Sequence, residues 1–547
     1  MNAVNRILLF TVALLACVWI TVGQSRGGNW PTYGGDAQRS GWEGADASIT
    51  KDSVKDLQLL WKLKLETQSR GMRPVMPPVI QGRLISYRGF KELAFVATNS
   101  DIVYAIDADL GTIFWQKHLE YSVREPQVKT SSSACPGGLT AMPTMPAPAR
   151  GAATRGVPAP PAAAQRGSAF IGGPASVYAL SSDGRLHRLN TSTGDDMTQP
   201  VSVLPANARA TSLSMVDNVI YTVTSHECNG APNAVWAIDL NMDPPKVRSF
   251  ALSGGTSWSI GGPVIGGTGA VHIQTAARVD STEQWTAGVH SLTPGELKAR
   301  FDSTAERSVA ADSADFGNLI NVASPILFTY KDRELIASVC SSNRLCLSDS
   351  ASVDVAAPQT PQSVRTSPIV QVARGLSGLV ERGIWGSLSS WQDADGTRWV
   401  LGAVTGPLHP DLKVPMTNGL TPNGSIVAFR VQEQAGKMAL EPAWVSRDLD
   451  SPLPPVIANG VVFALSAGEF TRQLKSTDGD TTVDERAKGS SHATLYALDA
   501  RTGRELYSSR NLISVPASLT GLTVANGRVY FGGIDGSFYA FGMNMER

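Results

Sequence analysis

Short runs of alternating apolar and polar residues recur along the chain, separated by turns rich in Asp, Asn and Gly. In the clearest case, IVYAIDADLGTIFW at residues 102–115, the alternation predicts a strand, Asp107 and Gly111 predict a turn, and the apolar TIFW predicts a second strand. The same order returns in TLYALDARTGRELY at residues 494–507. Both segments are therefore expected to form β-hairpins.

Weaker copies of this hairpin lie between the two. They begin near Arg185, Ala234, Gly288 and Ser425, and one or two further strand-like runs precede each. The copies recur at roughly 50 to 80 residues, a spacing that fits propeller blades with inserted loops. A single four-stranded sheet cannot bury both of its faces alone, so the sheets must pack side by side. The pattern predicts an all-β chain folded as a β-propeller of four-stranded blades.

Eight blades are expected from the positions of the outer hairpins. These lie near Ile102, Arg185, Ala234, Gly288, Arg344, Ser425, Thr494 and Ser537. The fifth, around RLCLSDS, has the weakest pattern, so seven blades are the alternative. An Ala- and Pro-rich run at residues 143–167 is expected to be a flexible insertion in the second blade.

The two ends of the chain predict how the ring closes. After its last turn the chain runs through RVYFGGIDGSFYAF and stops, which leaves the last blade without an outer strand. LQLLWKLKLE at residues 57–66 is a lone strand with Trp61 where other outer strands carry Trp115 or Tyr507. We expect residues 57–66 to complete the last blade, because this pairing removes an open sheet edge.

Charge and composition narrow the choice of partners. Lys and Arg together number 47, as do Asp and Glu, so the formal net charge is zero. Without a basic field no nucleic-acid partner is expected. The 52 Gly and 33 Pro are spread along the chain, which favours short strands joined by tight turns.

The first residues are typical of a secretory signal peptide. One basic residue precedes an apolar run at residues 7–22, and small or polar residues follow. We expect a signal peptide over residues 1–24 and a single propeller domain over 25–547, exported to the periplasm or the extracellular space, with no transmembrane span in the mature chain. An uncleaved anchor is one alternative, although about 16 apolar residues is short against the ~20 of a spanning helix. Lipidation at Cys17 is another, which the apolar residues after it disfavour.

Four cysteines remain in the expected mature chain, an even number suited to an oxidising compartment. In VCSSNRLC a short turn would place Cys340 and Cys346 on facing strands, near bridging distance for a disulfide. The pairing of Cys135 and Cys228 stays open. The sequence has no C-x-x-C-H motif and its seven histidines are scattered, so neither covalent haem nor zinc is expected and no metal ligand is assigned.

Two hairpins resemble the tryptophan-docking repeat of the pyrroloquinoline quinone (PQQ) propeller superfamily, Ala-x-Asp-x-x-Thr-Gly-x-x-x-Trp. AIDADLGTIFW at residues 105–115 follows this repeat with Leu110 in place of Thr, and ALDARTGRELY at residues 497–507 follows it with Tyr507 in place of Trp. The opening NWPTYGGDAQRSGW, at residues 29–42, is similar to the start of mature chains in this superfamily. The resemblance implies that the docking Trp packs between adjacent blades and makes a hydrogen bond through its ring.

The resemblance leaves function open, because the superfamily holds both enzymes and binding proteins. Its quinoprotein dehydrogenases bind PQQ with calcium, whereas the lipoprotein of the outer-membrane assembly machinery is a non-catalytic propeller. The dehydrogenases commonly hold the quinone between a Trp and a disulfide of adjacent cysteines, and no Cys-Cys occurs here. They also need Glu and Asn or Asp as calcium ligands and an Asp as base, and no local motif carries these roles over.

Candidate site residues come from loop positions alone. Asp315 as base and Asn318 for the cofactor site lie in DSADFGNLINVASP, before an inner strand, although ordinary turns use the same residue types. Trp385 offers a flat surface for the rings of PQQ, although core packing is the more frequent role of such a residue. Arg124 offers a cation for its carboxylates, although a solvated ion pair explains it equally well.

Two functional classes remain. The residues that form the propeller are present while those of a reaction are not identified, which favours an exported binding or scaffold propeller of the PQQ-repeat type. Its partner would be an unknown protein or small-molecule ligand at a channel mouth. The alternative is a PQQ- and calcium-dependent quinoprotein dehydrogenase that oxidises an alcohol or a sugar.

Overall fold

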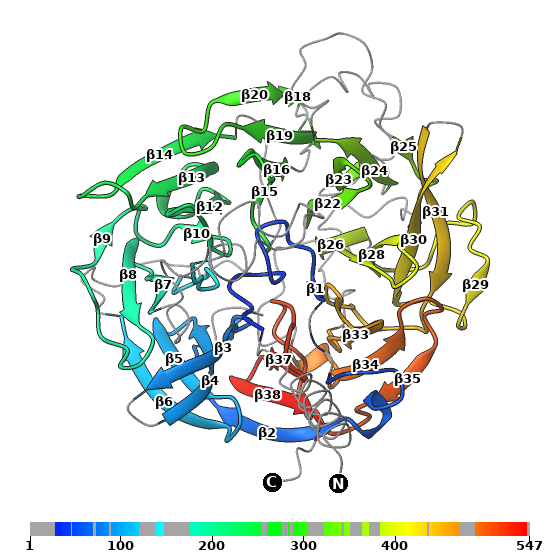
Figure 1. Ribbon diagram of the computed structural model, residues 1–547, viewed down its shortest axis with the longest axis horizontal. Coiled ribbons are helices and arrows are strands. Elements are labelled where there is room, and N and C mark those ends of the chain that lie inside the picture. The colour runs from blue at the N-terminus through cyan, green and yellow to red at the C-terminus, as the bar shows by residue number, and fades with distance from the viewer. Residues whose placement is uncertain are drawn as a thin grey trace, which may run out of the picture.

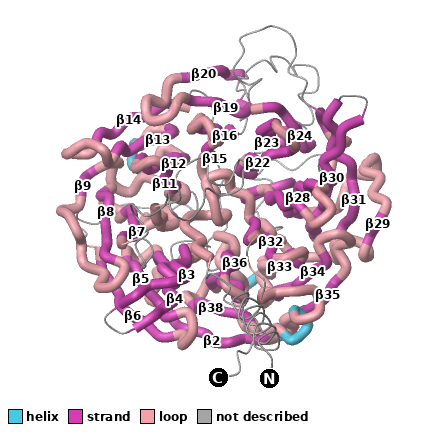
Figure 2. Tube along the Cα trace, in the orientation of Figure 1, coloured by secondary structure: helices cyan, strands magenta, loops and turns pink. Residues whose placement is uncertain are grey.

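The computed structural model is almost entirely β (Figure 2). The described residues also hold two short 3-10 turns, η1 (Val54–Asp56) and η2 (Cys228–Gly230). No helix in this part of the chain is long and apolar enough to cross a membrane. The structure describes residues 28–44, 46, 48–68, 73–86, 89–119, 135, 137–146, 175–252, 260–275, 279–280, 283–284, 288–302, 322–340, 344–350, 364–370, 383–434, 437–469 and 487–543.

Eight sheets follow one another around a ring, in chain order (Figure 1). Numbered as blades along the chain, the first four contain β3 (Val79–Ser86), β4 (Gly89–Thr98), β5 (Ile102–Asp107) and β6 (Thr112–His118); β7 (Ser176–Leu180), β8 (Arg185–Asn190) and β9 (Val201–Ser202); β10 (Arg209–Ala210), β11 (Ser214–Val216), β12 (Val219–Ser225), β13 (Ala234–Asp239) and β14 (Lys246–Ala251); and β15 (Val264–Ile265), β16 (Val271–Thr275), β19 (Gly288–Leu292) and β20 (Ala299–Asp302). A small hairpin, β17 (Val279–Asp280) and β18 (Glu283–Gln284), belongs to none of these sheets.

The other four blades complete the ring. They contain β22 (Ile326–Tyr330), β23 (Arg333–Cys340), β24 (Arg344–Asp349) and β25 (Val364–Arg365); β21 (Val322–Ser324), β26 (Gly383–Ser387), β27 (Ser389–Gln392), β28 (Arg398–Thr405), β29 (Met416–Thr417), β30 (Gly424–Gln434) and β31 (Lys437–Val445); β1 (Trp42–Glu43), β32 (Val456–Ala458), β33 (Val461–Ser466), β34 (Thr494–Asp499) and β35 (Glu505–Ser508); and β36 (Thr523–Ala525), β37 (Arg528–Gly532), β38 (Ser537–Gly542) and β2 (Gln58–Lys64). The all-β, eight-bladed expectation is confirmed, including the fifth blade with the weak pattern.

The middle strands are buried on both faces because each blade packs between two neighbours. Every residue of β5, β37 and β38 is buried. The largest apolar cluster of the described residues joins Phe463 of blade 7, Tyr530 of blade 8 and Val96 of blade 1. Alternating side chains of one strand thus serve two different blade boundaries, which is why the strands are apolar on both faces.

The ring closes as the sequence predicts. β2 pairs antiparallel with β38, from Gln58 opposite Gly542 to Lys64 opposite Ser537. The last blade therefore takes its outer strand from the N-terminal part of the chain, and both sheet edges at this point are covered.

Docking tryptophans join three pairs of neighbouring blades. Each donates its ring N–H to a backbone carbonyl in the hairpin turn of the next blade: Trp61 to Ala108 (2.9 Å), Trp115 to Thr191 (2.9 Å) and Trp444 to Ala500 (3.0 Å). The ring lies directly on a glycine of that turn, and any side chain on Gly111 would collide with Trp61. The docking repeat therefore forms a contact between adjacent blades, as the resemblance implied.

Two sequence expectations need comment. Thr144, near the start of the insertion expected over residues 143–167, forms a bridge with Tyr178 in blade 2. The insertion itself stays a prediction. Residues 147–174 lie outside the described part. Cys346 is disulfide-bonded, but the side chain of Cys340 is not described, so their pairing stays a prediction.

Candidate functional site

The two faces of the ring differ in the loops that they carry. Two-residue turns between first and second strands, such as Asn526–Gly527 of blade 8, mark what we call the lower face. The connections that lead into each first strand open on the opposite, upper face. Since connecting loops vary freely while strands are constrained by packing, either face can hold a ligand site.

The segment at residues 28–50, here called the plug, starts and ends at the lower face. Gly28 donates its backbone N–H to Asn526 (2.5 Å), and the carbonyl of Ile49 accepts from Asn459 (2.8 Å), both in lower-face turns. Midway, Tyr33 packs against Gly261 and Gly521, in the connections into blades 4 and 8. The plug therefore rises into the channel as far as Tyr33 and returns, and Figure 1 shows it in dark blue across the centre of the ring.

The plug is bonded to the inner part of every blade. Its described residues exchange backbone or side-chain hydrogen bonds with Ile80, Met145, Leu213, Ile265, Leu327, Ser390, Ile457 and Gly527, one in each of blades 1 to 8. Trp30 and Tyr33 are buried within it. The plug thus fills the lower part of the channel and contacts all eight blades.

A buried cation lies within the plug, next to Tyr33. Arg39 has no exposed surface, and its Nη1 donates to the carbonyl of Tyr33 (2.7 Å) and the hydroxyl of Thr32 (2.9 Å). Its Nη2 has no hydrogen-bond partner among the described residues. Burial lowers the pKa of Arg39 to about 10, and burial raises the pKa of Tyr33, so the guanidinium stays charged and the phenol neutral at pH 7.

Three further basic side chains gather at the upper mouth. Arg73 lies in the connection into blade 1, and its charge acts on Tyr33, Arg209 and His226. Arg209, on β10, lies opposite Ser225 in the sheet of blade 3, and His226 follows directly with its Nδ1 2.9 Å from the Ser225 hydroxyl. The cluster Arg73–Arg209–His226, here called the mouth cluster, is thus assembled from blades 1 and 3 above the plug.

The electrostatics of the mouth cluster are dominated by the two arginines. Burial, and then the charge of Arg73, lowers the pKa of Arg209 to about 9. Burial, and then the charges of Arg209 and Arg73, lowers the pKa of His226 to about 2. The imidazole is therefore neutral across the physiological range and offers hydrogen bonds without charge.

A disulfide fixes one wall of this mouth. Cys135, in the connection from blade 1 to blade 2, is bonded to Cys228, in the loop that follows His226, with Cα atoms 5.5 Å apart. Asn229 in the same loop donates to the carbonyl of Ala206 (2.9 Å). The cross-link ties two upper-face loops from different blades and answers the pairing that the sequence left open.

The arrangement suits an anion and not a divalent cation. Guanidinium groups match carboxylates and phosphates in geometry as well as charge. Calcium needs six or more oxygen ligands, commonly carboxylates. The described residues contain no group of three or more His, Cys, Asp or Glu side chains that could hold a metal ion. The part of the mouth that the structure describes thus fits the carboxylates of PQQ, and it does not fit calcium.

The described structure does not test the candidate site residues from the sequence. Trp385 lies on β26, where its backbone pairs with Val322, but its side chain is not described. Arg124, Asp315 and Asn318 lie outside the described residues, so their roles stay predictions. The mouth cluster was missed because each of its residues stands alone in a loop without a motif. A basic residue in the connection that leads into a first strand, as in RPVMPPVI, was the available signal.

Comparison with known proteins supports the fold. No protein-family model and no curated protein sequence matches the chain. A crystal structure of quinohemoprotein alcohol dehydrogenase from Comamonas testosteroni is similar with a TM-score of 0.54 and 13% identity, over 97% of this chain and 82% of that one. A europium-containing methanol dehydrogenase is similar with a TM-score of 0.54 and 12% identity, over 94% and 98%. At such identities the likeness shows the fold alone: the chain shares the fold of these two dehydrogenases, in keeping with the propeller that the docking repeats predicted.

Proposed function

We propose that the protein is an exported β-propeller that binds a small carboxylate-bearing ligand at the mouth cluster. The observation that carries this proposal is that blade 3 places Arg209 opposite Ser225, next to the uncharged His226, at the upper mouth. The charge of Arg73 from blade 1 acts on both side chains. Two guanidinium groups that lie close together attract a carboxylate more strongly than either group does alone. A third cation, Arg39, lies below them in the plug, and its Nη2 has no hydrogen-bond partner among the described residues.

The surroundings support binding from one side. The plug fills the channel beneath the mouth cluster, so a ligand approaches from the upper face. Export is supported by the signal-like residues 1–24 and by the Cys135–Cys228 disulfide, which persists only in an oxidising compartment. A binding role needs no reacting group at the site, in keeping with a described mouth that contains cations and a neutral imidazole.

A PQQ-dependent oxidation of an alcohol or a sugar is the second candidate. The fold shared with quinoprotein dehydrogenases favours it, and the carboxylates of PQQ suit Arg73 and Arg209. When bound, PQQ supplies a two-electron acceptor. In this candidate Arg124 and Trp385 would help to hold the quinone, and Asp315 and Asn318 would supply base and calcium roles.

A titration with PQQ separates the two candidates. The absorption spectrum of PQQ should change on addition of the purified protein, with or without calcium, and no alcohol-dependent dye reduction should follow. Arg209→Gln should weaken uptake at least tenfold, whereas Arg504→Gln, an exposed arginine in a lower-face turn, should leave it unchanged. Calcium-dependent dye reduction that Asp315→Ala and Asn318→Ala abolish would establish the enzyme instead. Citrate, a small carboxylate-bearing molecule, serves as a second probe. If neither PQQ nor citrate binds, the anion site is refuted.

A further inference from the structure

Blade 1 carries an extension on the lower face that blades 7 and 8 lack. In those blades the first and second strands are joined by two-residue turns, so that Ala458 faces Val461 and Ala525 faces Arg528. β3 and β4 instead continue through three more pairs, to Ser86 opposite Gly89. The added residues project beyond the neighbouring turns.

The extension places a carboxylate where blade 7 has glycine. The carbonyl of Gly460 accepts the N–H of Ala500 in blade 7, and the carbonyl of Glu92 accepts the N–H of Ala108 in blade 1. Glu92 therefore occupies the position of Gly460. The pair Ile85 and Phe90 at the projecting end is 45% and 75% exposed. Glu92 is largely withdrawn from solvent, which costs stability, and the exposed ring of Phe90 gains little from burial, so packing alone does not explain this extension.

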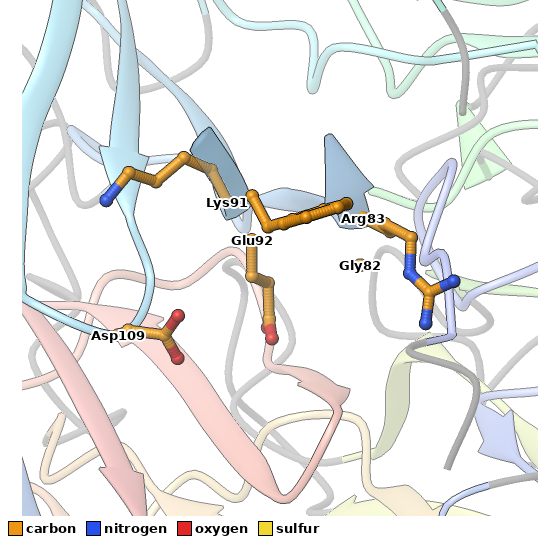
Figure 3. A pocket seen from close by; sticks show the side chains of 6 residues that line it. Gly82, Arg83, Lys91, Glu92 and Asp109 are labelled. Atoms are coloured by element: carbon orange, nitrogen blue, oxygen red, sulfur yellow. The ribbon is translucent and has the colours of Figure 1, made fainter. Parts of the chain in front are cut away.

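The extension forms one wall of a cleft of about 410 Å³, large enough for a small organic molecule. Five of its six lining residues come from the extension, and the sixth belongs to the turn between β5 and β6: Gly82, Arg83, Phe90, Lys91, Glu92 and Asp109. Figure 3 shows Glu92 and Asp109 reaching in from one side and Arg83 lying on the other, while Lys91 is turned away. The ammonium of Lys91 is 2.7 Å from the carboxylate of Asp107.

The acidic side of the cleft carries more carboxylates than cations. Arg528 of blade 8 is shared between Glu92 (3.0 Å) and Asp109 (2.6 Å), and the hydroxyl of Tyr530 lies 3.3 Å from Glu92. One guanidinium thus faces two carboxyl groups, and the Asp109 side chain is 47% exposed. On the opposite side Arg83 is exposed and forms no ion pair with any described residue. The cleft therefore presents charges of opposite sign on its two sides, and its lining includes the aromatic ring of Phe90.

We propose that this cleft binds a small zwitterion with an apolar side chain, a free amino acid or a short peptide. Its ammonium group would lie against Glu92 and Asp109, its carboxylate against Arg83, and its side chain on Phe90. A ligand with only an ammonium group would interact only with the acidic side, and a ligand with only a carboxylate would interact only with Arg83. This site lies on the opposite face from the mouth cluster and does not depend on the function proposed there.

The pKa of Glu92 bears on how the acidic side of the cleft would bind an ammonium group. Burial raises the pKa of Glu92 to about 7, although Arg528 and a hydrogen bond from Asn526 act to lower it. A ligand ammonium beside this carboxylate favours the ionised form. Between pH 6 and pH 8 the affinity for the zwitterion should therefore rise. Below the pKa of Glu92 the rise is up to about tenfold for each pH unit, and above that pKa the affinity levels off. Glu92→Gln removes this dependence while it keeps the size of the side chain.

Calorimetric titration of the full chain tests the proposal with four probes. L-leucine carries both charges, 3-methylbutylamine only the ammonium, 4-methylpentanoate only the carboxylate, and the dipeptide Leu-Leu extends the backbone. Leucine or Leu-Leu should bind at least tenfold more tightly than either single-charge analogue, and the tighter of the two identifies a free amino acid or a short peptide.

Variants locate the binding. Arg83→Ala should lower the affinity for leucine at least tenfold and leave the affinity for 3-methylbutylamine unchanged. Asp109→Asn should lower the affinity for both probes. Arg510→Ala, an exposed arginine of the connection into blade 8, is the matched control. Arg83 is exposed, so its removal should not alter the melting temperature. If no probe binds, or if leucine binds equally well to native protein and Arg83→Ala, the proposal is overturned.

Discussion

The boundary between blades 8 and 1 and the boundary between blades 4 and 5 are built from the same kind of strands, but they are held together differently. At the first, Trp61 docks on Gly111, and Arg528 bridges Glu92 and Asp109. The hydroxyls of Ser518 and Thr520 also both donate to the carbonyl of Val75 (2.9 Å each). This boundary is therefore held by side-chain contacts both near the channel, at Val75, and near the outer rim, at Trp61.

The second boundary depends on fewer kinds of contact among the described residues. A small apolar cluster of Val264, Leu327 and Ile336 lies at its centre. Near it, Gln274 of blade 4 bonds both backbone groups of Val339 where β22 no longer pairs with β23. Glu334 accepts the N–H of Gly267 (2.7 Å).

The difference follows from how the chain is connected. Blades 4 and 5 are neighbours in the sequence, so the chain itself keeps them together. Blade 8 has no chain connection onward to blade 1 except through β2, which enters from the other end of the sequence. Docking of a Trp also occurs between blades 1 and 2 and between blades 6 and 7. The ion pairs of Arg528 and the hydroxyl contacts with Val75 are added to it at the boundary that the chain itself does not hold together.

Removing residues 1–66 should have the largest effect. The truncation exposes β38 on one side and removes the Trp61 dock and the plug, so two blades present bare edges and the protein should aggregate. Size-exclusion chromatography measures this outcome. A soluble, monomeric truncation would show that closure does not depend on β2.

Trp61→Ala should destabilise the closing boundary more than the loss of an undocked tryptophan. We expect the free energy of unfolding to fall by about 2–4 kcal/mol in urea denaturation, because burial and the ring hydrogen bond are both lost. Trp236→Ala is the control, since the N–H of Trp236 bonds to Thr224 within its own blade (2.7 Å). Equal losses would mean that docking between blades adds nothing.

Gln274→Met tests the weaker boundary. The substitution leaves the buried N–H and carbonyl of Val339 unpaired, which should cost about 1–3 kcal/mol. Differential scanning calorimetry should show this loss with the fold unchanged. A larger loss than for Trp61→Ala would reverse the comparison between the two boundaries.

Glu92 should make the closing boundary sensitive to pH. Its pKa is raised from 4.5 to about 7 in the folded protein, mainly by burial, in the presence of Arg528, Tyr530 and Asp109. The folded state therefore holds this proton more tightly, and the stabilisation is complete below pH 4.5 and is lost as pH rises to 7. The loss should amount to about 1–3 kcal/mol. Denaturation of Glu92→Gln at several pH values should show a flatter profile, and an unchanged profile would contradict the assignment.

The architecture was open to prediction from the sequence because it depends on local patterns. A period of two marks the strands, and the Asp-x-x-x-Gly turns before Trp115 and Tyr507 mark the outer hairpins. The lone strand with Trp61 predicted closure because the last blade lacked an outer strand. Each of these signals concerns one blade or one edge.

The plug and the two proposed ligand sites were not predictable in this way. The plug has little strand alternation, and its hydrogen bonds go to backbone groups of eight separate blades. Arg73, Arg209 and His226 meet only because blades 1 and 3 face a common channel. Arg528 reaches Glu92 and Asp109 only because the ring is closed. Such sites depend on the assembled ring, and no spacing along the chain encodes them.

Calorimetric titration of PQQ in the presence of EDTA tests the proposed function most directly, because it measures the anion site without calcium. Native protein should bind PQQ, and the Arg73→Gln/Arg209→Gln double variant should bind it at least tenfold more weakly with an unchanged melting temperature. Equal affinity of the two proteins, or no binding by the native protein, would contradict a ligand site at the mouth cluster.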